Sequence, residues 1–196
     1  MGIIDIYDNT DVDRTHGIKK IVNLISNDWG VDLKSSKTLD MFAGDGSFCT
    51  DILLSLVSKN SVCWDIDPLK LEKIKLKYNI KTISGDVINS IKNNKDKFDI
   101  IHCDNPSSAF GLNDVIPFIN TLFNNNCIFI HNLNSSPYNF DFKSEWALKR
   151  NSFYNLHDTS KLNIKDTINF HKDYFQNLNI KVKKYDIIER EMYKGE

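Results

Sequence analysis

A short apolar run that breaks into a Gly-x-Gly turn constrains the fold of this chain more than any other feature. Residues 39–42 resemble a buried strand, Gly44 and Gly46 form the turn, and a helix-like segment follows. Glycine adopts backbone angles closed to other residues and has no side chain, so a ligand can approach the main chain here. The start of the following helix adds unpaired backbone N–H groups. The pattern predicts a nucleotide pocket in an α/β protein.

The same turn argues against a dinucleotide as the ligand. The dinucleotide-binding fingerprint has the form G-x-G-x-x-G, and Cys49 stands where its third glycine is expected. Instead, Asp40, Phe42, Gly44 and Gly46 follow the order Asp-x-Phe-x-Gly-x-Gly. This segment resembles the first motif of the class I S-adenosylmethionine-dependent methyltransferases.

Three later segments follow the same family pattern in the family's order. A second strand ends at Asp65, to which the resemblance assigns the ribose hydroxyls. A third short strand leads to Asp86, which the resemblance places near the adenine amino group. Residues 98–106 resemble the fourth element, in which the chain leaves its strand at Asp104, beside the transferred methyl group.

Each of these features also has an ordinary structural interpretation. A glycine pair after an apolar run forms many tight turns, and Asp65 or Asp86 would equally serve as a helix cap or a solvated loop acid. The order of four elements, over about residues 37–134, favours the methyltransferase interpretation. The resemblance then implies an enzyme with S-adenosyl-L-methionine as its cofactor. The residues it assigns to the cofactor are Asp40, Phe42, Ala43, Gly44, Gly46, Asp65, Ile66, Gly85, Asp86 and Val87.

Length and composition bound the remaining possibilities. A chain of 196 residues fits a single domain, residues 1–196, with an N-terminal helix (about 16–28), a cofactor half (about 37–104) and an acceptor half (about 105–196). The net charge of −1 gives no general basic field for nucleic acid. No segment has the apolar length of a membrane span or the core of a signal peptide, so we expect a cytoplasmic protein. The four cysteines lack C-x-x-C spacing, so neither zinc nor disulfides are expected.

Alternating short apolar runs and amphipathic segments predict an α/β fold. The resemblance implies the Rossmann-like class I methyltransferase form, a mostly parallel twisted sheet with helices on both faces. Expected helices cover residues 16–28, the segments after the glycine turn and after Asp67 and Pro68, a segment from near Pro117 to residue 123, and residues 145–150 and 164–178; later strands cover residues 81–84, 98–103, 127–131 and 180–189.

The end of the chain departs from the family pattern. A complete class I sheet ends in a hairpin whose seventh, antiparallel strand lies beside strand five, but little sequence remains after Arg190 for a separate strand. The sequence therefore predicts a sheet without a complete C-terminal β-hairpin. Two explanations stay open: the last strand takes an unusual place, or the chain is part of a longer polypeptide that completes it.

Residues near the transferred methyl group decide the acceptor. Nucleobase amino-methyltransferases carry D/N-P-P-Y/F after strand four, and residues 104–107 here lack its first proline and its aromatic. Metal-dependent O-methyltransferases place an Asp after strand four and Asp-Asn after strand five. This chain offers Asp104, then His131 and Asn132, as ligands for Mg²⁺ or another divalent cation. Without metal, Asp104 or His131 would act as general base; His131 would equally be a strand-end histidine bonded to a backbone carbonyl.

Three functions remain open. The first is O-methylation of a hydroxyl on a small molecule or a glycan, favoured by the near-neutral charge and the missing aromatic after strand four. The second, ranked lower, is N-methylation of a nucleobase in DNA or RNA, favoured by the Phe-Ala-Gly-x-Gly form of the first motif. The third is a subunit that binds S-adenosylmethionine without turnover.

Overall fold

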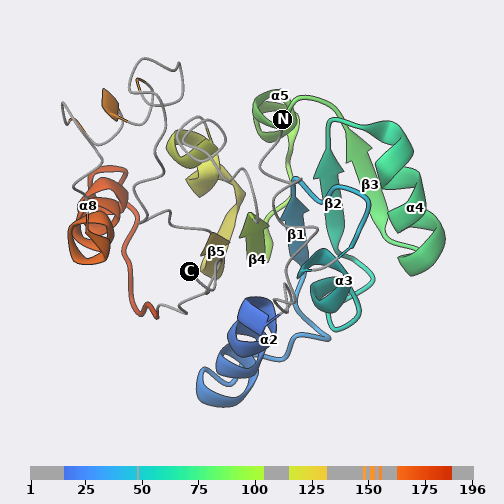
Figure 1. The fold of residues 1–196 in the computed structure, drawn as a ribbon, viewed down its shortest axis with the longest axis horizontal. Helices are drawn as coiled ribbons and strands as arrows, with labels where there is room; N and C mark the ends of the chain where they lie inside the picture. Colours follow the sequence, from blue (N-terminus) through green and yellow to red (C-terminus); the bar gives the residue numbers. More distant parts are fainter. Residues whose placement is uncertain are drawn as a thin grey trace, which may run out of the picture.

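A five-stranded, wholly parallel sheet forms the centre of the fold. The structure, a computed structural model, describes residues 16–47, 49–103, 115–131, 148, 151–152, 155 and 163–186. The strand order is β3-β2-β1-β4-β5 (Figure 1). The chain therefore winds outward from β1 to one edge, then returns to the middle and winds to the other edge, which is the doubly wound arrangement. The strands are β1 Thr38–Met41, β2 Val62–Asp65, β3 Lys81–Ser84, β4 Phe98–Cys103 and β5 Phe123–His131.

Helices connect the strands and begin at residues suited to that task. Asp67 caps α4 by accepting hydrogen bonds from Leu69 N and Lys70 N, with Pro68 at the first helical position. Asp86 caps α5 through Asn89 N, and Asn163 caps α8 through Asp166 N. The helices are α2 His16–Asn23, α3 Cys49–Leu54, α4 Pro68–Tyr78, α5 Val87–Asn93 and α8 Ile164–Asn177, with a π-helix η1 Leu24–Asp28, a short helical stretch at residues 115–119 and a 3₁₀ helix η2 Asn120–Leu122.

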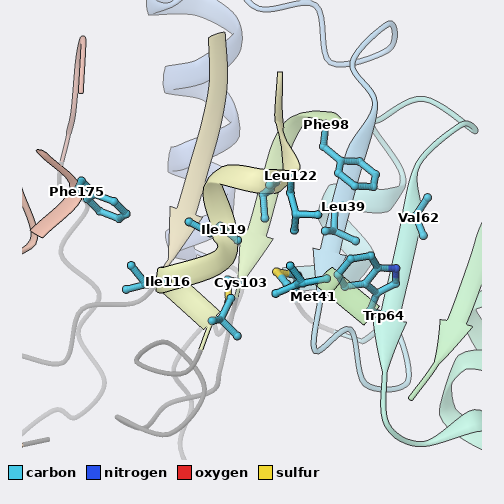
Figure 2. Packing of buried hydrophobic residues seen from close by; sticks show 13 residues of the cluster. Leu39, Met41, Val62, Trp64, Phe98, Cys103, Ile116, Ile119, Leu122 and Phe175 are labelled. Carbon is cyan, nitrogen blue, oxygen red and sulfur yellow. The ribbon is translucent and has the colours of Figure 1, made fainter. Parts of the chain in front are cut away.

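Apolar side chains cover both faces of the sheet. On one face, Leu39 and Met41 of β1 pack with Trp64 and with residues of α5, residues 115–119 and α8 (Figure 2). On the other face, α2, α3 and α4 bury Ile100 and Cys63. Strands enclosed on both faces need mostly apolar sequence, which explains the apolar residues Phe98, Ile100, Ile101 and Cys103 of β4.

Most of the predicted elements are confirmed. The expected α/β architecture, a parallel sheet with helices on both faces, is the observed one. Strands 81–84 and 98–103 have the predicted bounds, and helices α2 with η1, α3, α4 and α8 lie where the apolar spacing placed them. β5 begins at Phe123, four residues before the expected 127, because η2 ends at Leu122 and the helix predicted to reach residue 123 stops there. Of the helix predicted at 145–150, only Leu148 is described, and it is helical.

The predicted closing strand at 180–189 is wrong over its described residues, 180–186. Residues 181–186 are exposed and form no strand, and 187–189 lie outside the described residues. Two consecutive lysines interrupt the alternation that a strand needs. Lys183 instead donates a hydrogen bond to the Asn126 side chain, and Lys184 Nζ lies 5.0 Å from the centre of the Trp29 ring. In the described part of the chain the sheet therefore has no C-terminal hairpin, and no helix there is long and apolar enough to cross a membrane.

Candidate functional site

The loop after β1 lies at the point where the strand order reverses. β1 pairs with β2 on one side and with β4 on the other, so the connections from β1 and β4 leave the sheet in opposite directions. In open α/β sheets, ligands bind beside the carboxyl ends of the strands at this switch point. The glycine turn at residues 44–46 and the end of β2 at Asp65 both lie there.

The carboxylate of Asp65 connects the two loops at this edge. Its Oδ2 atom accepts a hydrogen bond from Gly44 N over 2.8 Å, and its Oδ1 atom accepts one from Asp67 N over 3.0 Å. The backbone adds two more contacts, because Ala43 N donates to Trp64 O and Gly85 N donates to Asp65 O, each at 3.0 Å. The half-buried carboxylate is therefore held in one orientation by main-chain donors.

The two glycines of the turn have different surroundings. Both have positive φ, 58° for Gly44 and 79° for Gly46, which favours glycine over any L side chain. A Cβ added to Gly44 would meet nothing within 4 Å, whereas a Cβ on Gly46 would lie 2.7 Å from Cγ1 of Ile74. Gly46 is thus required for helix packing, and Gly44 leaves open space beside the main chain.

Phe42 stores backbone strain next to this turn. It has φ of 61°, a left-handed conformation that costs a non-glycine residue roughly 1–2 kcal/mol. Such outliers gather at ligand sites, where the surrounding structure enforces them. The half-buried Phe42 side chain packs against the core that contains Met41 and Trp64.

The remaining residues assigned to the cofactor lie along the same edge. Ile66 follows Asp65, and its large apolar side chain is 76% exposed. Gly85 follows β3, and Asp86 and Val87 begin α5. Asp86 accepts from Asn89 N over 2.9 Å through Oδ1 only, so it is a helix cap with a second carboxylate oxygen that this cap does not use.

Asp40 is the buried acid among the residues assigned to the cofactor, whereas Asp65 and Asp86 are half-buried or exposed. It is 1% exposed, and its Oδ1 atom lies 2.8 Å from Nδ1 of His102, its partner across β1 and β4. The Oδ2 atom of Asp40 is buried without a hydrogen-bond partner among the residues that the structure describes. This contact was not apparent in the sequence, because the register between two strands cannot be read from either strand alone.

His131 belongs to an aromatic cluster at the carboxyl end of β5. It aligns with Cys103, the last residue of β4, and its ring stacks on Phe129 with centroids 4.7 Å apart. The ring of His171, from α8, lies 5.4 Å away, and Phe175 lies at 6.2 Å. Burial, and next the proximity of His131, lower the pKa of His171 to about 3. The helical spacing of His171 and Phe175 was visible in the sequence, but its pairing with β5 was not.

Two of the three predicted metal ligands, Asp104 and Asn132, lie outside the described residues. Asp104 is also one of the two predicted catalytic residues. The third predicted ligand, His131, is described. Within the described ranges, no group of three or more His, Cys, Asp or Glu side chains has the proximity of a metal site. The predicted cation therefore gains no support from the structure.

Fold and site together define a doubly wound, Rossmann-like α/β protein with an acid and a glycine turn at its switch point. No protein-family model matches the sequence, and no curated protein is significantly similar to it. The fold is similar to those of several solved structures.

Three of these structures illustrate the likeness. The ribosomal protein L11 methylase from Lactobacillus delbrueckii subsp. bulgaricus is 18% identical, with a TM-score of 0.44 over 60% of this chain and 56% of that one. An S-adenosylmethionine-dependent methyltransferase from Clostridium acetobutylicum is 20% identical, with a TM-score of 0.49 over 69% and 57%. Streptomyces venezuelae DesVI is 12% identical, with a TM-score of 0.49 over 72% and 61%. The chain spans less than two thirds of each of these three; at such low similarity the fold assignment depends on the sheet order itself.

Proposed function

We propose that the protein is an S-adenosylmethionine-dependent methyltransferase whose cofactor binds at the carboxyl ends of β1 and β2. The observation that carries this proposal is the Asp65 carboxylate, held by Gly44 N and Asp67 N at the switch point. An acid at the end of the second strand is the usual partner of a ribose diol in this kind of fold.

The residues present fit a nucleoside. A carboxylate offers about four lone-pair positions, and the protein uses one on each oxygen of Asp65. One position on each oxygen remains for the two hydroxyls of a ribose. The open space beside Gly44 admits a ligand against the main chain, and the exposed Ile66 side chain offers an apolar surface for a base.

When bound, S-adenosylmethionine supplies a methyl group activated by a positively charged sulfur. The protein's own task is to bind, to orient and to exclude water. Asp65 orients the sugar, Gly44 permits close approach of the cofactor, and Ile66 shields one face of the base. Asp86 offers its unused oxygen to the adenine amino group.

For the acceptor we propose a hydroxyl on a small molecule or glycan. His131 supports this choice, since it lies at the carboxyl end of β5 beside the end of β4, on the acceptor side of the switch point. A neutral histidine can take the proton that a hydroxyl loses as its oxygen becomes methylated. In this proposal Asp104 lies near the transferred methyl group.

Binding of the cofactor is tested by calorimetry with S-adenosylmethionine and S-adenosylhomocysteine. We expect the wild type to bind both, and Asp65→Ala to weaken binding at least tenfold, because hydrogen bonds to charged groups contribute about 1.5–3 kcal/mol. Asp173→Ala removes an exposed acid from α8 and is the matched control. Failure of the wild type to bind either compound would remove the proposal.

The acceptor is tested by transfer of labelled methyl groups to sugars, phenols and oligonucleotides. We expect hydroxyl acceptors to be methylated and His131→Gln and Asp104→Asn to reduce turnover about 10²-fold or more. Parallel reactions with Mg²⁺ and with chelator decide between cation and general base: loss of turnover with chelator indicates a cation at Asp104, His131 and Asn132. Methylation of oligonucleotides alone would replace the first choice by the nucleobase alternative. A chain that binds the cofactor but transfers to none of these acceptors would favour a non-catalytic subunit.

A further inference from the structure

Helix α4 lies directly against the glycine turn and the start of α3. Its buried Ile74 side chain occupies the space that a Cβ on Gly46 would need, with Cγ1 at 2.7 Å, and the Tyr78 ring lies 3.7 Å from the same point. These contacts join the turn after β1 to the helix after β2. The shape of the turn therefore depends on α4 as well as on its own two glycines.

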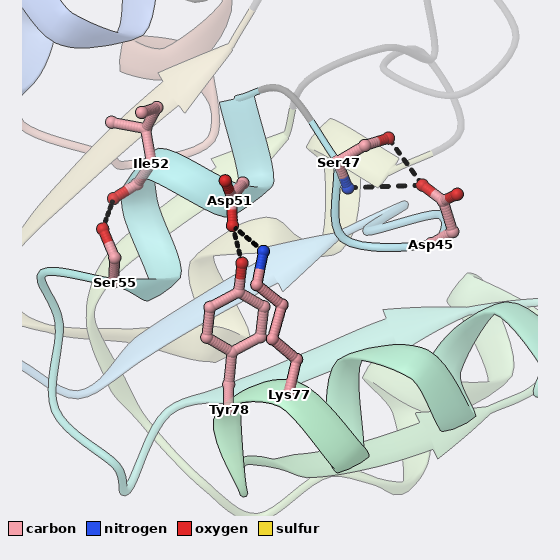
Figure 3. A network of polar contacts seen from close by, with 7 residues as sticks. All are labelled: Asp45, Ser47, Asp51, Ile52, Ser55, Lys77 and Tyr78. Atoms are coloured by element: carbon pink, nitrogen blue, oxygen red, sulfur yellow. Dashed lines mark hydrogen bonds and ion pairs between the residues drawn. The ribbon is translucent and has the colours of Figure 1, made fainter.

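Polar contacts from α4 hold the two segments that flank Gly46. Lys77 Nζ lies 2.6 Å from Oδ1 of Asp51, in the first turn of α3, and the Tyr78 hydroxyl donates to the same oxygen (Figure 3). On the other side, Lys73 Nζ lies 3.6 Å from Oδ2 of Asp45, within the turn.

Asp45 is itself fixed inside the turn. Its Oδ1 atom accepts hydrogen bonds from the Ser47 hydroxyl, at 2.5 Å, and from Ser47 N, at 3.2 Å (Figure 3). The Ser47 hydroxyl bond, followed by the Ser47 backbone bond and the Lys73 charge, outweighs partial burial and lowers the pKa of Asp45. The carboxylate thus stays charged and available to Lys73 near neutral pH.

The spacing of these residues on α4 concentrates them on one side of the helix. Positions 73 and 77, and positions 74 and 78, are each four residues apart and lie one above the other. The same helix is capped by Asp67, whose N–H donates a hydrogen bond to the carboxylate of Asp65. One rigid helix therefore joins the carboxylate at the end of β2 to the turn after β1.

We propose that α4 sets the conformation of the glycine turn for the cofactor, with Lys73, Ile74 and Tyr78 as positioning residues that act on Asp45, Gly46 and Asp51. We call the contacts of Lys73, Ile74 and Tyr78 with Asp45, Gly46 and Asp51 the brace. The inference rests on the proposed function for its ligand, although the brace is a property of the protein alone. None of the three positioning residues contacts the cofactor in the proposal; they act through the turn.

The contacts differ in strength. An exposed ion pair such as Lys73 with Asp45 contributes little, because water and salt screen it. The Tyr78 hydroxyl donates to the carboxylate of Asp51, and both residues are half-buried. Hydrogen bonds to a charged carboxylate are among the stronger ones. Tyr78→Phe removes that bond and keeps the ring against Gly46, so it is the most informative single variant.

The test combines amide hydrogen exchange with ligand binding. Gly44 N and Gly46 N are both hydrogen-bonded and therefore report on the turn. We expect Tyr78→Phe to speed exchange at residues 44–47 and in the first turn of α3 by about tenfold, as loss of a charge-assisted bond implies, and to weaken S-adenosylhomocysteine binding several-fold. Lys73→Ala should give a smaller change of the same kind. Lys75→Ala is the matched control, since Lys75 is exposed on α4 and forms no ion pair with the described residues.

The outcomes separate this inference from the proposed function. Faster exchange confined to the turn and the start of α3 supports the brace, whereas a purely structural role of Tyr78 would speed exchange equally in β1 and β4. Unchanged exchange at residues 44–47 in Tyr78→Phe overturns it. If the wild type binds no S-adenosylmethionine or S-adenosylhomocysteine, the proposed function fails. Hydrogen exchange at residues 44–47 in the free protein still tests whether α4 holds the turn.

Discussion

The Oδ2 atom of Asp65 accepts a hydrogen bond from the backbone N–H of Gly44 over 2.8 Å, so the end of β2 is tied to the turn after β1. The two residues are 21 positions apart in the sequence, and adjacent parallel strands bring them together. This bond orients the carboxylate before any ligand arrives. A preformed site loses less conformational freedom on binding, which improves affinity.

Gly44→Ala should mainly impair cofactor binding, whereas Gly46→Ala should mainly lower the stability of the fold. At Gly44 the added methyl meets no atom, so we expect a stability cost of only the left-handed backbone, about 1–2 kcal/mol, together with loss of cofactor binding. At Gly46 the methyl collides with Ile74, and overpacking adds roughly 1–3 kcal/mol to the backbone cost. Urea denaturation measures the stability cost of each variant, and calorimetry measures its cofactor binding.

A double-mutant cycle isolates the collision at Gly46. In an Ile74→Ala background the space is vacant, so Gly46→Ala should cost at least about 1 kcal/mol less than it does in the wild type. An equal cost in both backgrounds would mean that Ile74 does not restrict this position.

Asp86→Ser separates two roles of one carboxylate. Serine is as good a helix cap as aspartate, so the cap to Asn89 N survives and the free energy of unfolding should stay within about 0.5 kcal/mol of the wild type. Asp86→Ala should cost about 1 kcal/mol, as loss of a cap usually does. If the carboxylate also binds the adenine amino group, both variants weaken S-adenosylmethionine binding to a similar extent. Wild-type affinity in Asp86→Ser would leave Asp86 as a cap only.

The pair of Asp40 and His102 should be sensitive to loss of the histidine. His102→Ala leaves a carboxylate buried between β1 and β4 without this partner, and removal of one member of a buried pair costs roughly 3–5 kcal/mol. Asp40→Asn retains a hydrogen-bonding group of the same shape and should cost less. Thermal or urea unfolding of the two variants gives the comparison, and the reverse order would contradict it.

Stability should fall on acidification partly because of His171. Its folded-state pKa of about 3 lies below the value of 6.5 expected in the unfolded chain, so between these values the unfolded state binds the extra proton. The stabilising contribution is complete above pH 6.5 and is lost as the pH falls toward 3. The slope approaches about 1.4 kcal/mol per pH unit for one such group.

A variant without an ionisable side chain at this position tests the assignment. Measured in urea between pH 7 and 4.5, His171→Leu should lose less stability on acidification than the wild type does. Lys172, the half-buried residue next to His171 on α8, provides a control substitution that should leave the slope unchanged. Parallel pH profiles for wild type and His171→Leu would show that other groups cause the acid sensitivity.

The sequence alone determined the order of elements and the position of the turn. The short strands at 81–84 and 98–103 and the turn from Asp40 to Gly46 depend on local residue patterns and on backbone angles that glycine adopts readily. Such information lies in neighbouring residues. The strand predicted at 180–189 was wrong because it, too, was based on a local pattern, the alternation of apolar residues. In the structure Lys183 contacts the Asn126 side chain and Lys184 contacts the Trp29 ring, and the described residues of this segment pair with no strand.

Tertiary structure alone decided which distant groups meet. Strand register paired Asp40 with His102, packing of α8 on β5 brought His171 to His131, and contact between α4 and the turn gave Gly46 a reason to be glycine that differs from that of Gly44. Those contacts follow from how whole elements pack against one another, and that packing depends on summed burial over many residues instead of on any local pattern.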